Sequence, residues 1–127
     1  MESIKISFSE PKYYIHPHKK TTTCVIEYDI KCNPRELAIF RTAANVYNNW
    51  PPFKATGVSR LREGDKYDEN AGLSVARAMA ETQAYRDVSA WLNDTMRKLA
   101  NLYGSVNDFL DKSESTIQHN KEFVSKF

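Results

Sequence analysis

The residues of this chain with the clearest chemistry are arginines, which hold phosphate, and aromatic rings, which stack on a nucleobase. Arginine presents a planar fork that matches phosphate oxygens, and stacking on an aromatic ring holds a base in a sequence-tolerant way. Arg60 and Arg62 share one side of a predicted strand, and Tyr67 follows closely. This set predicts a site for a phosphate-bearing ligand.

A second set lies on a predicted long helix. A polar stripe on that helix holds Thr82, Arg86, Ser89, Asn93 and Arg97. Arg77 lies near the helix start, and Tyr85 offers a second ring. The alternative is a solvated face whose arginines form ion pairs with Glu81 and Asp94, and for any single arginine this is the favoured interpretation. For Tyr85 and Trp91, the alternative to stacking on a base is a place in the core or in an interface.

The residues that other kinds of site would need do not occur at the spacings typical of those sites. His16, His18, Cys24, Cys32 and His119 form neither C-x-x-C nor H-E-x-x-H, which argues against a metal site. The three histidines lie outside the predicted fold core, so no nucleophile has an evident base. With four glycines the chain has no glycine-rich phosphate loop. We therefore expect no enzymatic activity, no metal and no cofactor.

Length and composition favour one globular domain spanning residues 1–127. Hydrophobic residues make up 41% and charged residues 27% of the 127 residues, close to globular averages. The formal net charge of +2 does not suit a protein that coats nucleic acid nonspecifically, so an anionic partner requires a local basic cluster. No apolar run is long enough to span a bilayer and no signal peptide is evident. We expect a cytoplasmic protein, with Cys24 and Cys32 as reduced thiols facing a core.

Period-two alternation predicts three strands. They cover residues 4–8, 22–32 and 53–62, and residues 13–16 are either a further short strand or a loop. In the second strand, one face is predicted to be buried and consists of Cys24, Ile26, Tyr28, Ile30 and Cys32. Gly57, inside the third strand, marks either a bulge or a close backbone approach.

Two helices complete the predicted fold. Asn33 as N-cap, Pro34 at the first position and Glu36 three residues after the cap begin a helix over 34–49. A long helix over 69–103 carries an alanine-rich apolar stripe and is expected to break or bend at Gly104, and either another helix or a continuation of this one is expected after it. Residues beyond Lys112 are expected to be a looser tail, 112–127. The fold class is thus α+β, with an antiparallel sheet packed by one shorter helix and one long C-terminal helix in the order ββαβα.

The segments 53–60, 64–73, 76–81 and 84–85 resemble part of a known family. A last strand, an acidic turn and an alanine-rich helix follow one another there, as in small phage and bacterial proteins of the double-stranded-RNA-binding-like β-β-β-α type. The resemblance covers about 35 residues and implies the fold. Asp65, Asp68 and Glu69 stand where that family places a lysine cluster at the helix start, which disfavours duplex RNA binding.

The size and the strand-then-long-helix layout also resemble the anti-Thoeris sponge proteins of phages. That family sequesters cyclic ADP-ribose-type signals, and in some members cyclic oligonucleotides, without cleaving them. The resemblance implies a non-enzymatic counter-defence protein in the host cytoplasm that binds a cyclic nucleotide. The alternatives are a nucleic-acid-binding phage protein and an inhibitor that docks on a host protein.

Self-association is expected as well. The long helix carries apolar residues off its alanine stripe, namely Leu73, Met79, Tyr85 and Met96. A small sheet cannot cover all sides of one helix, so another copy is the expected partner.

Overall fold

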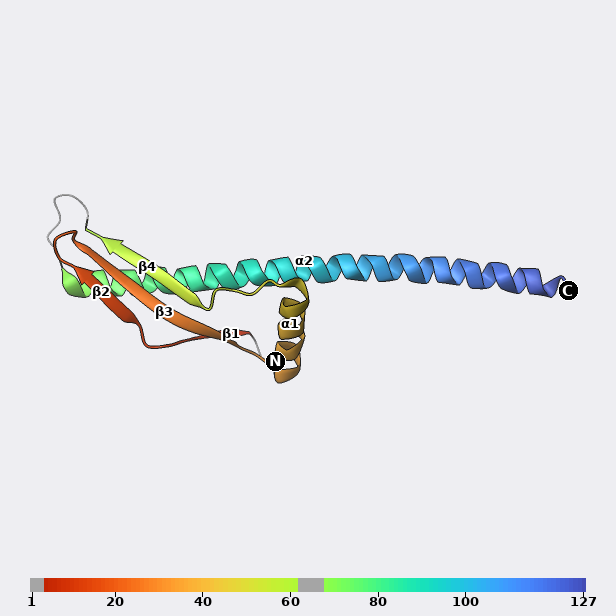
Figure 1. Cartoon of the computed structure of the whole chain (residues 1–127), viewed down its shortest axis with the longest axis horizontal. Helices are drawn as coiled ribbons and strands as arrows, with labels where there is room; N and C mark the ends of the chain where they lie inside the picture. The colour runs from red at the N-terminus through yellow and green to blue at the C-terminus, as the bar shows by residue number, and fades with distance from the viewer. Residues whose placement is uncertain (1–3, 62–67) are drawn as a thin grey trace. The chain divides into compact units, whose positions relative to one another are not determined.

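The computed structural model describes residues 4–61 and 68–127 of the chain. In order, it holds the strands β1 (Lys5–Phe8), β2 (Lys12–His16) and β3 (Thr21–Lys31), the helix α1 (Pro34–Tyr47), the strand β4 (Lys54–Arg60) and the helix α2 (Glu69–Ser125) (Figure 1). The chain divides into two compact units, Met1–Leu92 and Asn93–Phe127, and α2 contributes to both.

The first unit is built on an antiparallel sheet with β3 at its centre. β4 pairs with one edge of β3 over Thr21–Glu27, and β2 pairs with the other edge over Thr21–Val25. β1 pairs with the remaining part of β3, from Tyr28 to Lys31. Ser9 continues that pairing, because its backbone N–H donates to the Glu27 carbonyl at 2.9 Å and its hydroxyl accepts from the Glu27 N–H at 3.0 Å. Residues 13–16, for which the sequence left a strand or a loop open, belong to the strand β2.

The alternation predicted for the central strand is confirmed. Cys24, Ile26, Tyr28 and Ile30 are all buried, while Glu27 and Asp29 between them are exposed. Cys32 lies just past the end of β3 and is half-buried, and neither Cys24 nor Cys32 is in a disulfide. Successive side chains of a strand point to opposite faces, so this buried face must be covered by another layer.

The covering layer is the first part of α2, which lies alongside the strands in Figure 1. Its buried stripe consists of Ala76, Ala80, Ala84, Val88 and Trp91. A Cβ atom built on Gly57 of β4 would lie 2.2 Å from the Ala76 carbonyl oxygen and 2.4 Å from the Ala80 nitrogen. Gly57 pairs with Cys24 in an unbroken register. Of the two predicted alternatives for Gly57, the structure therefore has the close backbone approach.

Helix α1 begins and ends at residues suited to its ends. The Asn33 side chain accepts a hydrogen bond from the Arg35 N–H at 2.9 Å, and Pro34 occupies the first turn, which confirms the predicted start. Asn48 has left-handed φ and ψ angles of 52° and 45°, so the helix ends at Tyr47, before the predicted residue 49. The Phe40 ring packs against Trp91 of α2, with ring centroids 5.9 Å apart.

Helix α2 begins at Glu69, as predicted, and continues further than predicted. The Asp68 carboxylate accepts from the N–H groups of Asn70 and Ala71 at 3.0 and 3.3 Å. The predicted break at Gly104 is wrong, because α2 is continuous from Glu69 to Ser125. One glycine in a helix is unfavourable by only about 1 kcal/mol relative to alanine, which the turns around it offset.

The predicted α+β class is confirmed, as are the antiparallel sheet, the shorter helix and the long C-terminal helix. Within residues 4–61 and 68–127, none of the helices is long and apolar enough to cross a membrane.

Candidate functional site on the outer sheet face

The face of the sheet that points away from α2 carries an ordered set of exposed side chains. Gly57 and Thr22 both contact α2, so the residues adjacent to each along its strand point to the opposite side. We call this opposite side the outer face. Strand pairing sets its residues in rows across β2, β3 and β4, and neighbours in a row have Cβ atoms about 4.5–5.5 Å apart.

The central row of the outer face carries an exposed aromatic ring. Tyr14 pairs with Thr23, and Thr23 pairs with Val58. Tyr14 is 52% exposed, although aromatic residues dominate the packing of cores and interfaces. A ring held by a strand, beside small β-branched side chains, offers a flat surface on which a base can stack.

The rows on either side of Tyr14 bring basic groups to the same face. One row joins His16, Thr21 and Arg60, and the other joins Lys12, Val25 and Thr56. Lys12, His16 and Arg60 are all exposed. Arg60 is therefore placed on the same face of the sheet as the aromatic ring of Tyr14.

The turn between β2 and β3 adds further positive charge next to Arg60. It holds the exposed residues His18, Lys19 and Lys20, and it is fixed by hydrogen bonds from the Lys19 and Lys20 N–H groups to the carbonyls of His16 and Pro17, at 3.1 and 3.2 Å. The Leu61 N–H donates to the Lys20 carbonyl at 3.1 Å, so the end of β4 is attached to this turn. We call His16, His18, Lys19, Lys20 and Arg60 the basic end of the sheet. Such a local cluster can attract an anion although the chain as a whole is nearly neutral.

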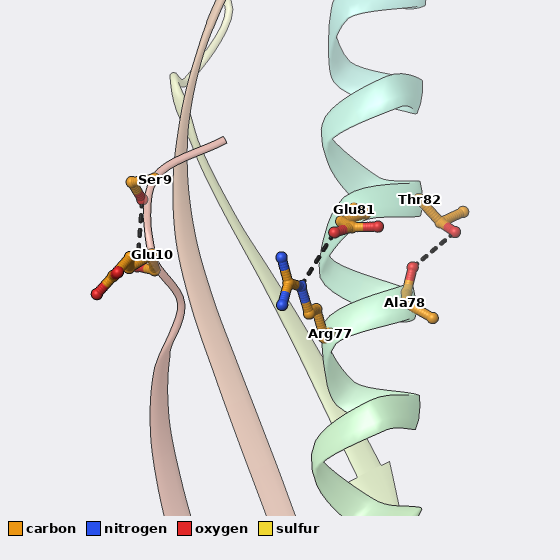
Figure 2. Close-up of polar contacts among 6 residues, drawn as sticks. All are labelled: Ser9, Glu10, Arg77, Ala78, Glu81 and Thr82. Atoms are coloured by element: carbon orange, nitrogen blue, oxygen red, sulfur yellow. Dashed lines mark hydrogen bonds and ion pairs between the residues drawn. The ribbon is translucent and has the colours of Figure 1, made fainter. Parts of the chain in front are cut away.

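Two of the predicted helix arginines are occupied by ion pairs. The Arg77 guanidinium donates to the Glu81 carboxylate at 3.2 Å, and this hydrogen bond raises the pKa of Arg77 above its ordinary value. Figure 2 shows Arg77 on the side of α2 nearer the strands, whereas Thr82 points to the other side, where its hydroxyl donates to the Ala78 carbonyl at 2.8 Å. Arg97 contacts the Asp94 carboxylate at 2.6 Å. For both arginines the ion-pair alternative is therefore the one seen.

The remaining predicted site residues are Tyr85, Arg86, Asn93, Arg62 and Tyr67. Tyr85 is about half exposed and its ring meets the Phe8 ring edge-on, with centroids 6.1 Å apart, while Arg86 is exposed on α2. Asn93 belongs to the second compact unit and Arg86 to the first. Arg62 and Tyr67 lie outside the described residues.

Sequence reasoning missed Lys12, Tyr14 and His16 as a group. The signal was present, because these three residues alternate with Tyr13 and Ile15 in residues 12–16. What the sequence could not supply was the partner strand that carries Arg60, which is joined to β2 only through β3.

The other polar features of the described residues are less suited to catalysis, metal binding or phosphate binding. Burial raises the pKa of the Cys24 thiol, so Cys24 is a poor nucleophile. The described residues contain no group of three or more His, Cys, Asp or Glu side chains that could hold a metal ion. A shallow depression in the second unit is lined by Asp111, Glu114, Ser115, Gln118, His119 and Glu122. Its carboxylates repel phosphate, which makes it unsuitable for the predicted ligand.

Comparison with known proteins returns no matching family model, no matching curated protein and no matching solved structure.

Proposed function

We propose that the protein is a non-enzymatic nucleic-acid-binding protein that holds a single strand on the outer face of its sheet. The observation that carries the proposal is the exposed Tyr14 ring, whose row lies between the row that holds Arg60 and the row that holds Lys12. Proteins that bind single strands combine a basic surface for the backbone with aromatic side chains for the bases. Tyr14 supplies the stacking ring, and the basic end supplies contacts to phosphate.

The shape of the surface favours a polymer over a small cyclic nucleotide. A small ligand is normally held in a concave pocket that buries most of its surface, whereas the rows around Tyr14 lie on one strand-paired face. Sequestration of a cyclic nucleotide would need enclosure, which a second copy would have to provide. That function, and the phage counter-defence role with it, stays a prediction from the sequence.

A single strand is also favoured over a duplex. Duplex-binding domains contact the phosphates of two grooves through shape, without unstacked bases. An exposed ring in the middle of the surface gains its stacking energy only from a base that is free of its complement.

The test is a titration of labelled single-stranded oligonucleotides, followed by fluorescence anisotropy, at several salt concentrations. Tyr14→Leu should weaken binding by about tenfold, because stacking on one ring contributes about 1–3 kcal/mol. Arg60→Ala should weaken binding and reduce the slope of log affinity against log salt by about 0.7, since one phosphate contact is lost. A duplex of the same length should bind less tightly.

Two matched variants on α2 serve as controls. Tyr85→Leu removes a ring that is about equally exposed, and Arg86→Ala removes an exposed guanidinium. Both should bind as the parent does. If these two weaken binding and the sheet variants do not, the helix site predicted from the sequence is the correct one. If the parent binds no single strand at low salt but releases an intact cyclic nucleotide on heating, the protein is a sponge and the present proposal is wrong.

A further inference from the structure

The second half of α2 carries an apolar stripe with the seven-residue period of a coiled coil. With Leu99 as position a, the a positions are Leu99, Val106, Ser113 and Asn120. The d positions are Leu102, Phe109, Thr116 and Phe123, and the e positions are Tyr103, Leu110, Ile117 and Val124. Between residues 99 and 125, the remaining positions hold polar or charged residues, apart from Ala100 and Gly104.

This stripe is exposed in the single chain. Tyr103, Phe109 and Phe123 are 69, 67 and 56% exposed, and the aliphatic members range from 36 to 68%. Helix α2 is the one regular element among residues 93–127. An isolated helix gains little stability in water without a packed face, so an apolar stripe of this length calls for a partner.

We propose that residues 99–125 of α2 associate with the same segment of further copies of this chain, in parallel and in register. A strict seven-residue period is the pattern of helices that wind around similar helices, because it keeps one seam facing the partner over many turns. The stripe includes e as well as a and d, and this greater width is typical of helices that face the core of a bundle. Further copies supply helices with the same period and the same width of stripe.

The area of the stripe is sufficient for a stable interface. A buried aromatic side chain covers about 150–250 Å², so the exposed parts of the three rings amount to roughly 300–500 Å². The aliphatic members add a comparable area. The sum approaches the approximately 800 Å² per partner of a standard specific interface.

Charge decides between parallel and antiparallel pairing. The g positions beside the stripe hold lysine at Lys98, Lys112 and Lys126, and no acidic residue. In an antiparallel pair, g positions face g positions, which would set lysines against lysines. In a parallel pair, g faces the apolar e position, where the lysine stem covers the partner's side chain and its ammonium group stays in water.

The polar a positions fix the register. Ser113 and Asn120 at a positions and Thr116 at a d position interrupt the apolar seam, and a polar residue at an a position is a known means of specifying alignment. Only an in-register parallel pairing places Asn120 opposite Asn120, where the two amides can hydrogen-bond to each other. A register shifted by one repeat would set one Asn120 against Ser113 and the other against Phe127, so the two amides could no longer pair.

This interface is distinct from the sheet face proposed to bind nucleic acid, and the two proposals can fail separately. Sequence reasoning expected self-association from Leu73, Met79, Tyr85 and Met96. Met79, Tyr85 and Met96 are exposed in the structure and Leu73 is half-buried. Of these four residues, Met96 lies seven residues before Tyr103 and therefore continues the e positions of the stripe toward the N-terminus.

The experiment is cysteine cross-linking of the full chain in a Cys32→Ser background. Ser113→Cys should form a disulfide-linked dimer in mild oxidant, because equal a positions face each other in a parallel, in-register assembly. Ser115→Cys, at an outward position two residues away, should remain largely monomeric on a non-reducing gel. Equal cross-linking of both variants would indicate random collision, and an assembled protein in which neither cross-links would exclude parallel pairing.

The assembly itself is measured by light scattering after size-exclusion chromatography. Leu110→Asp should shift the chain to monomer and lower the helical signal in circular dichroism. Gln118→Asp introduces the same charge on the outward face and should leave the assembly unchanged. A parent chain that is monomeric at all working concentrations would overturn the proposal, whatever the outcome of the nucleic-acid titration.

Discussion

Gly57 of β4 and Ala80 of α2 are in backbone contact, since a Cβ atom on Gly57 would lie 2.4 Å from the Ala80 nitrogen. The sheet and the helix therefore lie too close at this point for any side chain on residue 57. The small residues of the α2 stripe permit this approach, and Gly57 is the strand position that requires it.

The first prediction concerns this contact. Gly57→Ala should lower the free energy of unfolding by about 1–3 kcal/mol or more, because the added methyl group meets helix backbone, which cannot rotate away as a side chain can. Urea denaturation measures the change. Gly104→Ala is the matched control, since nothing lies within 4 Å of a Cβ built there, and it should raise stability by about 0.5–1 kcal/mol. A Gly57→Ala variant as stable as its parent would contradict the observed packing.

A second prediction addresses the contact between α1 and α2. The Trp91 indole N–H donates to the Asn49 carbonyl at 2.6 Å, just beyond the end of α1. Trp91→Phe keeps a ring but removes the donor, so stability should fall by about 0.5–1.5 kcal/mol, with a further loss from the smaller volume. Trp50→Phe, at a partly exposed tryptophan, should have a clearly smaller effect in the same thermal melt.

A third prediction concerns Asn48, whose backbone is in the left-handed conformation. Its φ of 52° suits glycine and asparagine, and a β-carbon without a compensating polar group is unfavourable there by about 1–2 kcal/mol. Asn48→Ala should therefore destabilise the chain, and Asn48→Gly should leave it as stable as the parent or slightly more so. The two denaturation midpoints, compared directly, decide the matter; an alanine variant equal to the glycine variant would rule out the proposed strain.

The fourth prediction is a loss of stability at alkaline pH. Burial raises the pKa of Cys24 above 9.0 and that of Tyr28 above 10.0. Because the folded pKa values lie above the unfolded ones, their contribution is present in full below about pH 9 and is lost as the pH rises through the folded values. The free energy of unfolding should thus decrease as the pH rises above about 9. Cys24→Ala should flatten the first part of this decrease, and an unchanged pH profile in that variant would show that the thiol contributes nothing.

Local residue patterns determined most of the fold. The alternation of Cys24, Ile26, Tyr28 and Ile30 predicted a half-buried strand, and Asn33 with Pro34 predicted where α1 begins; both signals act within a few residues. The break predicted at Gly104 was wrong because a single glycine is a small local penalty in a helix of 57 residues.

The candidate site was decided by tertiary structure. The sequence pointed to Arg60 as a phosphate-binding residue, but it could not show that Tyr14, 46 residues earlier, lies on the same face. That placement arises because β3 pairs with β2 on one edge and with β4 on the other, and hydrogen bonding across both edges brings Tyr14 and Arg60 to neighbouring rows. Strand pairing depends on which edges remain free after the chain has folded back on itself, and the residue types of any one strand do not determine it.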